Sequence, residues 1–249
     1  MAKDQSKTKG GRRHRKGDYQ APVHVPPVVP DPIGRQISAE DFSALIARAE
    51  AFAQRRFGPI LPQLGAAFFK GRTSDEVRDE GLQAAFRAWV LYGFRDQQGI
   101  RIIDMFAAAG IPPEGELARA LTAARQARWG IYEVLERNPG TKQVRVRNWT
   151  TQALAPSDEV DLLDRRAFDV LSLGSLLVGW FAPVGDLWRP LSAATFVPPS
   201  RAKLVRAGLD ALLSAQSADL DEFSQRGAIA LFWLAYGVAN LEEPESPSA

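Results

Sequence analysis

WGIYEVLERNPGTKQVRVRNW, residues 129–149, is the stretch that decides the fold. Apolar and polar residues alternate in both of its halves, and the sequence Asn-Pro-Gly-Thr between the halves is typical of a tight turn. The stretch therefore predicts a β-hairpin in which Val144 and Val146 face one side and Arg145 and Arg147 face the other. Helical patterns lie on both sides of it along the chain, so helices are expected to pack around a small sheet.

A second hairpin is predicted in residues 174–199, GSLLVGWFAPVGDLWRPLSAATFVPP, with its turn at Gly185 and Asp186. Residues 151–157, TQALAPS, predict a weaker third strand, whereas residues 157–168, SDEVDLLDRRAF, change to a helical or turn-like pattern. About five short strands that curl on themselves predict a small SH3- or OB-like β-barrel. We place this barrel at residues 129–199.

The part before the barrel, residues 37–128, predicts a helical region. One helix is expected to begin at Ser38, which has the side chain of an N-cap residue. A longer helix is predicted in residues 73–96, TSDEVRDEGLQAAFRAWVLYGFRD, with Thr73 or Ser74 as its cap.

Residues 200–241 predict two C-terminal helices that pack back on the barrel. Residues 242–249 are expected to form a disordered acidic tail, and residues 1–36 a disordered basic and proline-rich tail. The predicted fold class is therefore α+β, with a helical N-terminal part, a small barrel in the middle and two C-terminal helices.

Composition excludes several kinds of chemistry. The chain of 249 residues has no cysteine, which rules out disulfides, thiolate zinc sites, iron–sulfur clusters and a cysteine nucleophile. Both histidines, His14 and His24, lie in the N-terminal segment, and the chain contains no phosphate-binding or dinucleotide-binding glycine motif. We predict no catalytic residue, metal or cofactor. With no apolar run long enough to span a membrane, we expect a cytoplasmic protein.

Charge is distributed unevenly along the chain. Lys and Arg total 31 and Asp and Glu 29, but the first 18 residues hold seven of the cations and only Asp4 and Asp18. The remainder is therefore mildly acidic. A basic arm of this kind favours RNA, DNA or a ribosome surface as partner, and the alternative is a solubilising tail without a partner. The candidate nucleic-acid-binding residues are Lys7, Lys9, Arg12, Arg13, Arg15, Lys16, Arg145 and Arg147.

Tryptophans are concentrated in the predicted barrel. Small barrels often bind nucleic acid or peptide through exposed aromatic rings, so Trp149, Trp180 and Trp188 form a candidate interaction surface. The alternative is that these rings seal the barrel against the helices, because large aromatic side chains contribute strongly to core burial.

Four carboxylates form the densest acidic group of the chain. They are Asp158, Glu159, Asp161 and Asp164. Two of them could share a Mg²⁺ ion with water, which would suit a metal-dependent enzyme. The alternative is the capped start of a helix, since Arg165 and Arg166 follow directly.

One family resemblance rests on the hydrophobic pattern of residues 75–199. The matching positions are Phe86 and Trp89, followed by residues 132–134, 144–148, 174–178 and 188–192. In this pattern the chain resembles the helical and β region of bacterial proteins that carry a SEC-C motif, a short Cys-rich zinc segment. The zinc segment itself is absent, since the chain has no cysteine. The resemblance implies a non-enzymatic bacterial accessory protein. The basic arm and the barrel aromatics themselves predict a binding module for nucleic acid or ribosome surfaces, and the alternative is a protein–protein scaffold with an inert tail.

Overall fold

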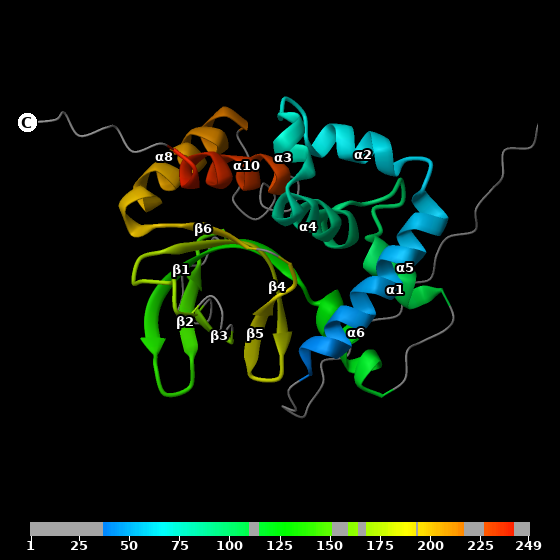
Figure 1. Cartoon of the computed structure of the whole chain (residues 1–249), viewed down its shortest axis with the longest axis horizontal. Helices are drawn as coiled ribbons and strands as arrows, with labels where there is room; N and C mark the ends of the chain where they lie inside the picture. Colours follow the sequence, from blue (N-terminus) through cyan, green and yellow to red (C-terminus); the bar gives the residue numbers. More distant parts are fainter. Residues whose placement is uncertain are drawn as a thin grey trace, which may run out of the picture.

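The computed structural model describes residues 37–109, 115–150, 159–163, 168–192, 194–216 and 227–241. Helices come first along the chain, the strands of a small barrel follow, and helices return at the end. Figure 1 shows the N-terminal helices beside the barrel and the C-terminal pair lying across it. The predicted α+β class with a central barrel is confirmed. The predictions for residues 1–36 and 242–249 lie outside the described residues.

Helix α1 (Ala39–Phe57) begins where the sequence predicts. The Ser38 hydroxyl oxygen accepts a 3.0 Å hydrogen bond from the backbone N–H of Asp41, and this bond caps the first turn. Gly58 follows the last turn as the C-cap residue. The inward face of α1 carries a stripe of buried side chains at helical spacing, formed by Phe42, Leu45, Ala49 and Ala53.

The single helix predicted in residues 73–96 is wrong, because the chain forms three shorter elements there. Helix α2 (Leu61–Phe68) precedes α3 (Ser74–Arg78), α4 (Glu80–Ala88) and the π-helical turn η1 (Trp89–Gly93). Thr73 and Glu76 form the capping box of α3. Asp79 is extended, and its Oδ1 accepts a 2.8 Å hydrogen bond from the N–H of Leu82. This second cap starts α4 in a new direction.

Two helices complete the N-terminal part. They are α5 (Ile102–Ala108) and α6 (Glu116–Arg125). Ile102 and Ile103 of α5 are fully buried in the same core cluster as Ala120 and Ala124 of α6. This cluster also contains Ala182 from the barrel, so it joins the helical part to the sheet.

Five strands close the barrel among the described residues, and a short sixth strand extends it. The six are β1 (Arg128–Asn138), β2 (Gln143–Asn148), β3 (Glu159–Leu163), β4 (Leu176–Val184), β5 (Leu187–Pro190) and β6 (Thr195–Val197). The order is β1-β2-β3-β5-β4, and β4 pairs back with β1. The parallel β3–β5 pairing places Leu162 opposite Trp188, whereas the other pairings are antiparallel.

Both predicted hairpins are present. In the first, Val144 and Val146 are fully buried and Arg145 faces outward, as the alternating pattern predicts. In the second, the turn lies at Gly185 and Asp186, but the returning strand is interrupted between Pro190 and Thr195. β5 and β6 therefore run along different parts of β4.

The helical or turn-like pattern predicted for residues 157–168 is wrong where the structure describes it, since Glu159–Leu163 forms β3. Leu162 points into the barrel core, while Glu159 and Asp161 lie opposite two arginines of β2. Cross-strand charge pairs and period-two burial together favour a strand over a helix start. The third strand predicted at residues 151–157 lies outside the described residues.

The C-terminal helices α8 (Pro199–Gln216) and α10 (Ala228–Ala239) cover one outer face of the barrel. Val205 and Leu231 from these helices are fully buried in one cluster with Leu176 and Val178 of β4. Leu177 lies between these two residues of β4, points to the opposite face of the sheet and packs into the barrel interior. β4 is therefore covered on both faces, which explains its nearly continuous apolar sequence. Within the described residues, no helix is both long enough and apolar enough to cross a membrane.

Candidate functional site

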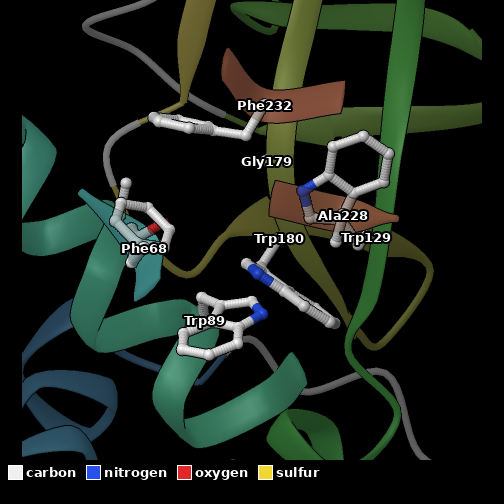
Figure 2. A pocket seen from close by; sticks show the side chains of 9 residues that line it. Phe68, Trp89, Trp129, Gly179, Trp180, Ala228 and Phe232 are labelled. Atoms are coloured by element: carbon white, nitrogen blue, oxygen red, sulfur yellow. The ribbon is translucent and has the colours of Figure 1, made fainter. Parts of the chain in front are cut away.

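An aromatic cluster lies where the three parts of the fold meet, and Figure 2 shows its members around a small space. Its rings belong to Phe68 of α2, Trp89 of η1, Trp129 of β1, Trp180 of β4 and Phe232 of α10. The centroid of Phe68 lies 5.8 Å from that of Trp89 and 5.6 Å from that of Phe232. The space between the rings is about 10 Å³, which is roughly enough for one water molecule. The cluster is a packed joint between helices and barrel, without room for a ligand.

The three tryptophans predicted as one interaction surface pack against different neighbours. Trp180 is half-buried at the joint, with its ring centroid 5.7 Å from that of Tyr92. Trp149 packs against the cluster beneath α8 and α10, and its Nε1–H donates a 2.9 Å hydrogen bond to Glu133. Trp188 packs against the cluster inside the barrel. Each ring is thus partly buried, with only part of its surface free for a partner.

The two barrel arginines predicted to bind nucleic acid form ion pairs across the outer face of the sheet. A nitrogen of Arg147 lies 2.6 Å from a carboxylate oxygen of Glu159, and Arg145 Nε lies 3.2 Å from Asp161. Arg145 also lies 3.9 Å from Glu136. The carboxylate partners raise the pKa of both guanidinium groups, chiefly through hydrogen bonding. The charge of each arginine is therefore largely balanced within the barrel.

Two of the four carboxylates considered for a metal site take part in these ion pairs. Glu159 and Asp161 face Arg147 and Arg145, while Asp158 and Asp164 lie outside the described residues. Within the part of the chain that the structure describes, no three His, Asp or Glu side chains are grouped to hold a metal ion. The predicted basic arm, with Lys7, Lys9, Arg12, Arg13, Arg15 and Lys16, also lies outside the described residues.

A cavity of about 200 Å³ opens into the barrel interior. Its walls are mainly apolar and are formed by Val144, Leu162, Val170, Leu171, Leu177, Phe181, Pro190, Ser192, Ala194 and Phe196. These residues belong to all the strands except β1, to the turn that precedes β4 and to the segment between β5 and β6. We call this space the seam cavity, because it lies where β3 and β6 are not paired with each other.

The rim of the seam cavity exposes an apolar side chain. Val170, which lines the cavity, is 65% exposed although it is a large aliphatic residue. On the edge away from β4, β6 has no strand neighbour among the described residues. Sequence reasoning did not find this site. Val170 is an apolar residue in a turn segment, and that was the one local signal for it.

A wider groove of about 390 Å³ lies between α4, β6 and α10. Its lining includes Asp79, which already caps α4, and Tyr236 of α10. Burial and the nearby charges of Glu76 and Asp79 raise the pKa of Tyr236. Phe196 borders both this groove and the seam cavity. The short strand β6 therefore has open space on two sides.

Comparison with protein-family models, with curated proteins and with solved structures finds no match for this chain. The resemblance to proteins that carry a SEC-C motif therefore stays a prediction. The assignment of a function rests on the geometry of the chain itself.

Proposed function

We propose that the protein is a non-enzymatic protein-binding module, and that its barrel binds an extended apolar segment of a partner protein. The observation that supports this most directly is the seam cavity, with its apolar walls and the exposed side chain of Val170 at its rim. A cavity with mainly apolar walls is a usual place for a ligand or a partner side chain to bind.

The choice of an extended segment follows from the strand edges beside the cavity. β6 pairs with β4 along one edge, and β3 meets β5 at the Leu162–Trp188 position. A strand edge with free backbone groups can take up an additional strand, and a neighbouring pocket can then receive every second side chain. The preferred partner segment would therefore carry apolar residues at alternating positions.

Fluorescence anisotropy with labelled peptides tests this proposal. One peptide set should carry Val or Leu at every second position, and a second set the same residues at helical spacing. We expect saturable binding of the first set to the full chain, and a loss of at least about tenfold in affinity with Val170→Asp. Leu204→Asp is the matched control, because Leu204 is a 50% exposed aliphatic residue on α8, away from the cavity. Equal binding of both peptide sets, or binding unchanged by Val170→Asp, would refute the proposal.

A second candidate function is electrostatic binding of RNA or DNA by the basic arm. It is supported by the concentration of seven Lys and Arg in the first 18 residues. Because Arg145 and Arg147 are already paired with carboxylates, the arm would have to supply most of the phosphate contacts. A salt titration with a single-stranded oligonucleotide compares the full chain with a chain lacking residues 1–18. Affinity and its salt dependence should both fall on truncation, and an unchanged titration curve would exclude the arm.

A further inference from the structure

The groove of about 390 Å³ between α4, β6 and α10 opens between other elements than the seam cavity, although the two share Ala194 and Phe196. Its volume lies in the range of roughly 300–1,000 Å³ that is usual for small-molecule sites. The walls are mostly apolar, and Phe232 in one of them stacks on Tyr236, with ring centroids 6.3 Å apart. The groove therefore has room and apolar surface for the body of a small organic molecule, and this does not depend on the proposed function.

The polar side chains of the groove can all accept a hydrogen bond. Asp79 Oδ1 accepts the 2.8 Å bond from the N–H of Leu82, and Oδ2 has no partner among the described residues. The hydroxyls of Tyr236 and Thr195 also make no hydrogen bond with the described residues, and neither belongs to the hydroxyls that packing closes off from water. Asn240 donates a 2.8 Å bond from its amide nitrogen to the backbone oxygen of Tyr236, which leaves its amide oxygen as an acceptor.

The charge at the groove is negative. Among the described residues, Asp79 is the one charged side chain in the lining, and it forms no ion pair with them. The arginines nearby are already engaged. Arg72 pairs with Glu76 at 3.7 Å, and Arg201 donates a 2.7 Å hydrogen bond to the backbone oxygen of Ala239. The complement of this groove is therefore a cation.

We propose that this groove binds a small organic cation that carries a primary ammonium group on an aryl or short alkyl body. The ammonium pairs with Asp79 and donates a hydrogen bond to the hydroxyl oxygen of Tyr236. Burial raises the pKa of Tyr236, and the charges of Glu76 and Asp79 raise it further, so the phenol and the Asp79 carboxylate lie near each other. The apolar body of the ligand packs against Leu82 and Phe232, which line the same groove.

Isothermal titration of the full chain at about 0.1 M salt tests the inference, because more distant charges are screened over about 10 Å under that condition. The probe is phenethylammonium. 2-Phenylethanol has a similar body without the charge, phenylacetate has the opposite charge, and methylammonium has the charge without the body. We expect saturable binding of phenethylammonium, and at least about tenfold weaker binding of each of the other three.

Two substitutions test the polar contacts. Asp79→Asn removes the charge and keeps a side chain that can cap α4, and it should weaken phenethylammonium binding by at least about tenfold. Tyr236→Phe keeps the ring and should weaken binding by about threefold or more, since one hydrogen bond is lost. Asp75→Asn is the matched control, because Asp75 is an exposed carboxylate of α3 outside the groove, and binding should not change.

Three outcomes would overturn the inference. They are absence of saturable phenethylammonium binding up to about 10 mM, 2-phenylethanol binding as tight as that of phenethylammonium, and equal weakening by Asp75→Asn and Asp79→Asn. If Asp79→Asn fails to fold, Tyr236→Phe and the uncharged probe still decide the matter. Peptide binding at the seam cavity is measured separately with Val170→Asp, so either proposal can fail without the other.

Discussion

The indole N–H of Trp233 donates a 2.7 Å hydrogen bond to the backbone carbonyl oxygen of Phe68, 165 residues earlier in the chain. The same indole ring makes a second polar contact, a cation–π contact with Arg72. The guanidinium carbon of Arg72 lies 4.1 Å from the ring centroid. Trp233 therefore ties α10 to the end of α2 by direction-dependent contacts as well as by apolar packing.

Replacing Trp233 with Phe should lower the free energy of unfolding by about 2 kcal/mol, because the Phe68 carbonyl loses its donor and the cation–π contact weakens. Urea denaturation of both chains measures the change. Trp149→Phe is the comparison, since it also removes an indole hydrogen bond, to Glu133, but its cation–π partner Arg206 lies farther from the ring, at 5.5 Å from the centroid. A larger loss for Trp149→Phe than for Trp233→Phe would contradict this account.

Two glycine substitutions should change stability in opposite directions. A Cβ at Gly93 would lie 2.7 Å from Trp89 Cδ1 and 2.9 Å from Trp180 Cζ2, so Gly93→Ala should cost about 1–3 kcal/mol by overpacking the joint. Gly237 lies on the exposed side of α10, and a Cβ there meets no atom within 4 Å. Gly237→Ala should therefore stabilise the chain by about 0.5–1 kcal/mol through its helix propensity. Thermal or urea unfolding that ranks the two variants in the reverse order would rule out this reading.

Asp104 holds two arginines at a nearly buried position between α5 and α6. Its carboxylate oxygens lie 2.7 Å from Arg101 Nε and 2.9 Å from Arg125 Nε, and its side chain is 13% exposed. Asp104→Asn should destabilise the chain by about 3 kcal/mol, because two poorly solvated cations lose their counter-charge.

Asp169→Asn provides the control for this substitution. Asp169 lies 3.4 Å from Lys142, but its side chain is 71% exposed, so the change should stay within about 0.5 kcal/mol. If urea denaturation gave similar losses of unfolding free energy for Asp104→Asn and Asp169→Asn, burial would not determine how much these ion pairs contribute to stability.

Stability should fall in strongly alkaline solution because of two buried tyrosines. Burial raises the pKa of Tyr92 and Tyr132 above the ordinary value of 10.0, so the unfolded chain releases these protons first. Their contribution is complete below the unfolded pKa and is lost as the pH rises above it, by up to about 1.4 kcal/mol per pH unit for each tyrosine. Urea titrations on either side of about pH 10 should give a smaller pH slope for Tyr132→Phe. An identical slope would show that Tyr132 does not contribute.

The sequence predicts well the order of helices and strands along the chain, but it predicts poorly where one element ends and the next begins. The first hairpin and helix α1 depend on local signals, namely alternating residues around Asn-Pro-Gly-Thr and the Ser38 cap, and both are present in the structure. The sequence DEVDLLDRR predicts a helix start as readily as a strand, and the distant arginines of β2 decide between them. Residues on both sides of Asp79 have apolar side chains at helical spacing, which predicts one continuous helix. Asp79 caps a new helix instead, and so divides this segment into α3 and α4.

The candidate sites were harder to predict because they are assembled from distant segments. The seam cavity depends on strands that leave part of the barrel unpaired, and no local residue pattern records that. The groove beside β6 likewise needs α4, β6 and α10 together. From the sequence, Trp149, Trp180 and Trp188 were expected either to seal the barrel against the helices or to form an exposed surface. In the structure each of the three rings is partly buried.

Helix α10 also has a consequence for synthesis of the chain. A ribosome releases residues in order, so Phe68, Phe69 and Trp89 leave the exit tunnel long before Phe232 and Trp233, which cover them in the folded protein. Throughout that interval these rings form an exposed hydrophobic surface to which chaperones can bind. A chain that stops before Ala228 keeps this surface permanently uncovered, and quality-control proteases would recognise it.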